Sequence, residues 1–108
     1  MYDFHLDRYA YFQTQIKNTK NSIIPFLKSN GLGIKPGLKV LEIGCAEGGV
    51  LRAFVDKGCL GIGVELDELR YEQANVYLRK EITDGRIKLY NKNIFDLDFK
   101  EKFRGGGI

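Results

Sequence analysis

The most informative stretch of the sequence is residues 40–50, VLEIGCAEGGV, in which an apolar run leads into small residues and then into a helix pattern. A backbone without bulky side chains can approach a ligand closely, and the start of a helix offers unpaired N–H groups with a partial positive charge. Gly44, Ala46 and Gly49 fit the GxGxxG spacing of dinucleotide-binding loops, with alanine in the second position. A nucleoside-type ligand is therefore expected at this loop.

A second frame, (D/E)xGxGxG, is used by proteins that bind S-adenosylmethionine. It is filled here by four residues, again with alanine at the second glycine: Glu42, Gly44, Ala46 and Gly48. A carboxylate two residues before the first glycine would repel a pyrophosphate but suits a cation, and S-adenosylmethionine carries a sulfonium and an ammonium. The alternative is that Glu42 only anchors the loop by accepting backbone N–H bonds, because a buried charge must be paired. The sequence favours the cationic ligand.

Glu65 ends the apolar run of residues 59–64 and lies about 20 positions after Gly44. An acidic residue at this distance accepts hydrogen bonds from ribose hydroxyls in nucleotide-binding folds, and one carboxylate can accept two bonds from a vicinal diol. Asp67 is the rival residue, but it is better placed to cap the helix that follows. Glu65 is thus expected to hold the ribose of either nucleoside ligand.

Residues 88–99, KLYNKNIFDLDF, form the third stretch, and together the three stretches resemble class I S-adenosylmethionine-dependent methyltransferases over roughly residues 38–100. The resemblance implies that Glu42 and the loop surround the methionine part of the cofactor and that Glu65 holds the ribose. It implies that the Asn93 side chain and the Ile94 N–H contact the adenine, which Leu66 and Ile94 enclose. For Asn93 the alternative is an ordinary loop asparagine.

The same resemblance implies that the cofactor is S-adenosylmethionine and that the reaction is methyl transfer to an acceptor that the sequence does not identify. Because the nucleophile comes from the substrate, no catalytic residue is assigned. Two other hypotheses stay open: a non-catalytic cofactor-binding or interaction fragment, and an NAD-dependent oxidoreductase.

Strands and helices alternate along the chain, which predicts an α/β fold with a parallel sheet. Strands are expected at residues 39–43, 59–64 and 87–90, and helices at residues 7–30, 50–55 and 67–82, with a break near Asn21 and Ser22 caused by Pro25. Phe95, Phe99 and Phe103 are expected in the core. We divide the chain into an N-terminal helical segment, residues 1–36, and the front half of a Rossmann-like domain, residues 37–108.

The family resemblance implies a three-layer sandwich of seven strands in the order 3-2-1-4-5-7-6, of which this chain supplies strands 3-2-1. We therefore expect an incomplete, truncated domain. The strand at residues 39–43 would then be an edge with unpaired backbone groups, which favours self-association.

The composition is that of an ordinary globular chain: 108 residues, 44% hydrophobic, net charge +3. The basic residues are scattered rather than clustered, which does not favour nucleic-acid binding. Cys45 and Cys59 form no CxxC pattern, so we expect two reduced, buried thiols and no metal site. The first residues carry charges where a signal peptide needs an apolar stretch, and no apolar run has membrane-spanning length. The expected compartment is the cytoplasm.

Overall fold

The computed structural model describes residues 4–96 of the chain, and the side chains of residues 7–96. The N-terminal helices are α1 (Phe4–Asn18), the π-helix η1 (Thr19–Ile23) and α2 (Ile24–Ser29). The α/β part follows in this order: β1 (Lys39–Ile43), α3 (Gly49–Val55), β2 (Leu60–Val64), α4 (Glu68–Tyr77), α5 (Arg79–Thr83), β3 (Ile87–Tyr90) and the 3-10 turn η2 (Ile94–Asp96).

The three strands form one parallel sheet in the order β1-β2-β3, with β2 in the middle. Glu42 on β1 lies opposite Gly63 on β2 in the register. This confirms the predicted α/β class and strand order, and each strand lies within one residue of its predicted bounds. Among residues 4–96, no strand pairs with the outer edge of β1. Self-association through that edge stays a prediction.

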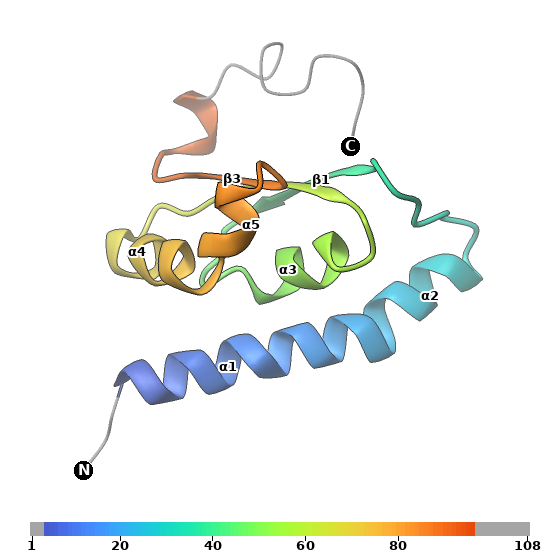
Figure 1. Ribbon diagram of the computed structural model, residues 1–108, viewed down its shortest axis with the longest axis horizontal. Coiled ribbons are helices and arrows are strands. Elements are labelled where there is room, and N and C mark those ends of the chain that lie inside the picture. The colour runs from blue at the N-terminus through green and yellow to red at the C-terminus, as the bar shows by residue number, and fades with distance from the viewer. Residues whose placement is uncertain (1–3, 97–108) are drawn as a thin grey trace.

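Helices cover one face of this sheet. Figure 1 shows α1, α3 and α4 on the same side of the strands, with α1 lying outside α3. The core between them is built from Leu51, Val55, Ala74, Leu78 and Ile87, to which α1 adds Phe12. Within the described part of the chain no α-helix covers the opposite face, so two of the three expected layers are present and the sheet is open (Figure 1).

Glycine on β2 lets α3 approach the sheet. A Cβ on Gly61 would lie 2.8 Å from the Leu51 side chain, and a Cβ on Gly63 would lie 2.8 Å from Leu89 and 2.9 Å from the Cys45 sulfur. All of these distances are shorter than the contacts that real Cβ atoms make. The close packing of α3 on β2 brings the start of that helix, and the loop before it, to the carboxyl ends of the strands.

The predicted break in the N-terminal helix is present as the π-helix η1. Pro25 has no N–H to donate within the helical ladder, so the backbone widens before it. The Ile24 N–H reaches the Thr19 carbonyl five residues back, and Pro25 then stands in the first turn of α2, where a missing donor costs little. The predicted boundary at residue 36 falls in the loop between α2 and β1, and the division into two units stays a prediction.

Two expectations were wrong, one about the length of a helix and one about a core residue. The helix predicted at residues 67–82 is divided into α4 and α5 at Leu78, whose φ of −105° and ψ of 16° leave the helical region. There the fully buried Leu78 side chain packs below Gly48. Phe95 is 90% exposed rather than in the core, because η2 lies beyond the carboxyl end of β3. Phe99 and Phe103 lie outside the described residues.

Candidate functional site at the carboxyl ends of the strands

The glycine loop, residues 44–49, connects β1 to α3. Gly44, Ala46 and Gly48 adopt positive φ angles of 70°, 51° and 85°. Ala46 is the only non-glycine residue with a positive φ in the part of the chain that the structure describes. This conformation costs an L-residue roughly 1–2 kcal/mol. The three alternating positions are those of the (D/E)xGxGxG frame, so the departure at Ala46 has a physical cost.

Hydrogen bonds tie this loop to the end of β2. The N–H groups of Gly44 and Cys45 donate to the Val64 carbonyl over 2.7 and 3.2 Å. The Ala46 N–H donates to Glu65 Oε1 over 2.7 Å. These bonds offset the cost at Ala46 and hold the loop in one conformation.

Glu65 is buried, and both of its carboxylate oxygens accept backbone N–H bonds. Besides the bond from Ala46, Oε2 accepts from the Asp67 N–H over 2.9 Å. Glu65 therefore anchors the loop, and Glu42, for which the sequence offered this role as the alternative, also accepts one backbone N–H, from Leu51. Each oxygen keeps a second lone pair, and the ribose contact of Glu65 stays a prediction. Asp67 caps α4 as expected, accepting from the N–H groups of Leu69 and Arg70.

Glu42 contrasts with Glu65. Its side chain points toward α3, and its Oε1 is buried without a hydrogen-bond partner among the described residues. Burial raises the pKa of Glu42 to about 7; the Leu51 N–H, which donates to the carboxyl, lowers it, and the charge of Glu65 raises it further. Glu42 therefore keeps its proton to a higher pH than a free glutamate does, and its Oε1 has capacity to accept a hydrogen bond from a ligand.

An open pocket of about 200 Å³ lies where the ends of β1, β2 and β3 meet. It is lined by Ile43, Gly44, Val64, Glu65, Leu66, Lys92, Asn93 and Ile94. Five predicted site residues are among these: Gly44, Glu65, Leu66, Asn93 and Ile94. Glu42, Ala46 and Gly48 do not line this pocket and belong to the loop beside it. The structure thus gathers the predicted adenine and ribose residues around one hollow.

The amide of Asn93 is already used within the chain, because its Oδ1 accepts from the Phe95 N–H over 3.0 Å. This bond begins η2 and places Ile94 at the pocket. A neighbouring residue that the sequence analysis missed is Asn91, whose Nδ2 donates to the carbonyls of Glu65 and Leu66 over 2.8 and 3.2 Å. Asn91 follows β3 directly. A polar residue at the end of a predicted strand is the sequence feature that could have identified it.

The sequence analysis also missed an ion pair between Arg8 on α1 and Glu47 in the glycine loop. Glu47 is fully buried, and the Arg8 Nε and Nη2 donate to its Oε1 and Oε2. A charged residue in a small-residue loop signals that a partner exists, but nothing in the sequence locates that partner 39 positions earlier.

The cysteines are free and buried, as predicted. Burial, the largest cause, together with the nearby carboxyls of Glu42 and Glu65, raises the pKa of Cys45 to about 12, so its thiol stays protonated. No cluster of three or more metal-ligating side chains occurs among residues whose side chains the structure describes. No helix in that part of the chain is long and apolar enough to cross a membrane.

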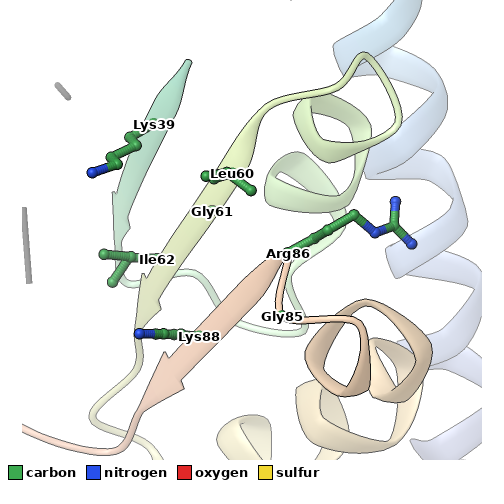
Figure 2. Close-up of a pocket in the computed structure, with 7 residues that line it drawn as sticks. All are labelled: Lys39, Leu60, Gly61, Ile62, Gly85, Arg86 and Lys88. Atoms are coloured by element: carbon green, nitrogen blue, oxygen red, sulfur yellow. The ribbon is translucent and has the colours of Figure 1, made fainter. Parts of the chain in front are cut away.

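A second pocket, of about 190 Å³, opens near the amino ends of the strands (Figure 2). Figure 2 shows Lys39, Ile62 and Lys88 pointing away from the helices, while Arg86 extends toward them. None of the predicted site residues lines it.

Comparison with known proteins agrees with this geometry. No protein-family profile matches the chain. A sterol 24-C-methyltransferase from Gibberella zeae is 29% identical over 102 residues, which are 91% of this chain and 26% of that protein. The chain is thus similar in sequence to curated methyltransferases. It spans about a quarter of the length of such curated relatives.

Solved structures of methyltransferases share the fold of this chain. A magnesium protoporphyrin IX methyltransferase from Synechocystis PCC 6803, solved with bound SAH, superposes with a TM-score of 0.61 at 16% identity, over 86% of this chain and 48% of that one. A putative sarcosine dimethylglycine methyltransferase from Galdieria sulphuraria gives a TM-score of 0.59 at 18% identity, over 69% and 29% of the two chains. The open three-stranded sheet therefore has the Rossmann-like fold of these solved structures.

Proposed function

We propose that the chain binds S-adenosylmethionine and forms the donor-binding part of a methyltransferase. The observation that carries the proposal is Glu42, a half-buried residue whose Oε1 is buried without a hydrogen-bond partner among the described residues. The nearby carboxylates of Glu47 and Glu65 already have partners within the chain. A cationic sulfur nucleoside supplies the hydrogen bond and the positive charge that Glu42 lacks. A dinucleotide pyrophosphate at the same place would meet this carboxylate, and the two would repel each other.

Different residues would contact different parts of the cofactor. Glu42, Gly44, Ala46 and Gly48 would surround the methionine part, and the positive φ angles of the last three leave the backbone open to close approach. Glu65 would accept from the ribose hydroxyls through its remaining lone pairs. Leu66, Asn93 and Ile94 would enclose the adenine in the open pocket, where Leu66 is 70% exposed.

The cofactor, when bound, supplies an activated methyl group on its sulfonium sulfur. The residues of the chain would bind and orient the cofactor. Hydrogen bonds to Val64 and Glu65 stabilise the conformation of the loop that contacts it. Holding a donor in one position lowers the entropic part of the transfer barrier. The curated relatives are named sterol 24-C-methyltransferases, and our proposal covers the methyl donor and leaves the acceptor unassigned.

Calorimetry on the full chain tests this proposal against the oxidoreductase hypothesis. S-adenosylmethionine and S-adenosylhomocysteine are expected to bind, and NAD is not. The Glu42→Gln variant keeps the shape of the side chain and is expected to weaken S-adenosylmethionine binding about tenfold through loss of the charge. Preferential uptake of NAD would contradict the proposal.

A methyl-transfer assay with a panel of acceptors then separates an enzyme from a non-catalytic cofactor-binding fragment. Binding without transfer to any acceptor would favour the fragment. Operation in the cytoplasm, self-association and the absence of nucleic-acid binding stay predictions.

A further inference from the structure

Glu47 is a buried charge at the centre of the glycine loop. Its exposed fraction is zero, and it is the only loop residue between Gly44 and Gly49 with an ionisable carboxyl. An isolated carboxylate at such a place is strongly unfavourable, so the side chain needs a partner that both neutralises it and satisfies its oxygens. No residue of the loop itself can do this.

The partner comes from the N-terminal helix. The Arg8 guanidinium donates through two nitrogens to the two oxygens of Glu47, the fork-to-fork geometry that fixes orientation as well as charge. Arg8 is itself held in place, because its guanidinium carbon lies 4.5 Å from the centre of the Tyr11 ring. Helix α1 therefore holds the glycine loop by a directed, two-bond contact.

A second contact brings α1 against the same loop. A Cβ added to Gly49 would lie 2.6 Å from the Phe12 carbonyl oxygen and 2.6 Å from the Gln15 Cβ. The backbone of α1 is thus packed directly on the first residue of α3. Two independent features, an ion pair at position 47 and a close approach at position 49, join α1 to the loop.

The chain contains a matched contact that does not involve the loop. Lys20, in η1, pairs with Asp56 at the other end of α3 over 2.7 Å, and both side chains are partly exposed. This pair also joins the N-terminal helical segment to α3. It differs from the Arg8–Glu47 pair in burial and in its distance along the chain from the glycine loop, so it serves as an internal control.

We infer that Arg8 and Glu47 are positioning residues that hold the glycine loop in its cofactor-binding conformation, so that docking of α1 determines cofactor affinity. The inference rests on the proposed S-adenosylmethionine function. Arg8 acts through Glu47 and the loop backbone, and needs no contact with the cofactor. Helix α1 then contributes to the free energy of cofactor binding, although none of its described side chains lines the pocket at the carboxyl ends of the strands.

The first test compares S-adenosylhomocysteine affinity and thermal stability in the full chain. The double variant Arg8→Met and Glu47→Met removes both charges and leaves no buried ion, so it is expected to melt within a few degrees of the original chain while binding about tenfold more weakly. Lys20→Met is expected to leave the affinity unchanged. A folded double variant with unchanged affinity would overturn the inference.

Arg8→Lys provides a second test if the double variant does not fold. Lysine keeps the charge but cannot form the two-bond fork, so weaker binding with a near-unchanged melting temperature is expected. Amide hydrogen exchange of residues 44–49 without ligand should be faster in Arg8→Lys than in Lys20→Met. Equal exchange in the two variants would contradict loop positioning. Failure of the original chain to bind either sulfur nucleoside would instead refute the proposed function, with the exchange result still deciding the role of Arg8.

Discussion

Glu42 and Glu65 lie near the carboxyl ends of adjacent strands, yet their carboxyl oxygens differ in their hydrogen-bond partners. Glu65 accepts two backbone N–H bonds and shapes the turn between β2 and α4. Glu42 lies on β1 opposite Gly63, and one of its oxygens is buried without a partner among the described residues. Hence a carboxyl with both oxygens bonded shapes the site, whereas one that keeps an unbonded oxygen is available to a ligand. Four predictions test this contrast.

The largest effect is expected from Gly63→Val, at the β2 position that pairs with Glu42 in the sheet. A valine side chain would enter space already filled by Leu89 and Cys45. Overpacking of this kind is expected to lower the free energy of unfolding by about 3 kcal/mol, measured by urea denaturation. The control is Lys88→Val, at an exposed strand position. An equal loss in both variants would contradict the packing described for β2.

Glu65→Ala tests whether the bonded carboxyl supports the loop. It leaves the N–H groups of Ala46 and Asp67 without their acceptor, and we expect a loss of about 2.5 kcal/mol in the free energy of unfolding. Glu68→Ala, an exposed position in the first turn of α4, is the matched control and should change stability little. If Glu65→Ala were as stable as the control, Glu65 would not anchor the loop.

The carboxyl of Glu42 is expected to make the free energy of unfolding depend on pH. Because burial raises the Glu42 pKa from 4.5 to about 7, the folded chain keeps a proton that the unfolded chain has lost in this interval. The free energy of unfolding should therefore fall as pH rises from 4.5 to 7 and become level above it. The expected total is about 2 kcal/mol, reduced from the full shift by partial exposure of the side chain.

Glu42→Gln isolates that contribution, because glutamine does not titrate. The difference in the free energy of unfolding between the variant and the original chain should grow from pH 4.5 to pH 7, with the variant more stable at pH 8. Parallel pH profiles, measured by urea denaturation at each pH, would show that Glu42 is not the group responsible.

The smallest effect is expected at the rim of the pocket. Leu66 is 70% exposed, so Leu66→Ala should leave stability unchanged but weaken S-adenosylhomocysteine binding about threefold through lost apolar contact. Leu69→Ala, which removes an exposed leucine outside the pocket, is the control. Equal affinities for the two variants would place the adenine elsewhere.

Much of the fold was predictable because its signals are local. The apolar runs at residues 39–43 and 87–90 are strands with the predicted bounds, and Asp67 caps α4. Pro25 predicted the break that η1 provides. The division at Leu78 was not predictable, since the periodicity of residues 67–82 continues across it. It depends on where Leu78 packs, and that position is set by the distant loop at Gly48.

For the candidate site, the residue types and their order could be predicted from the sequence: a carboxyl, a small-residue loop, a second carboxyl and a polar turn after the third strand. Which carboxyl has both oxygens bonded and which keeps an unbonded oxygen depends on N–H groups that other elements bring, so it follows only from the packed fold. It also decided that Arg8 neutralises Glu47. Spacing along the chain records local conformation, whereas pairing of buried charges depends on distances that exist only after α1 has packed on α3.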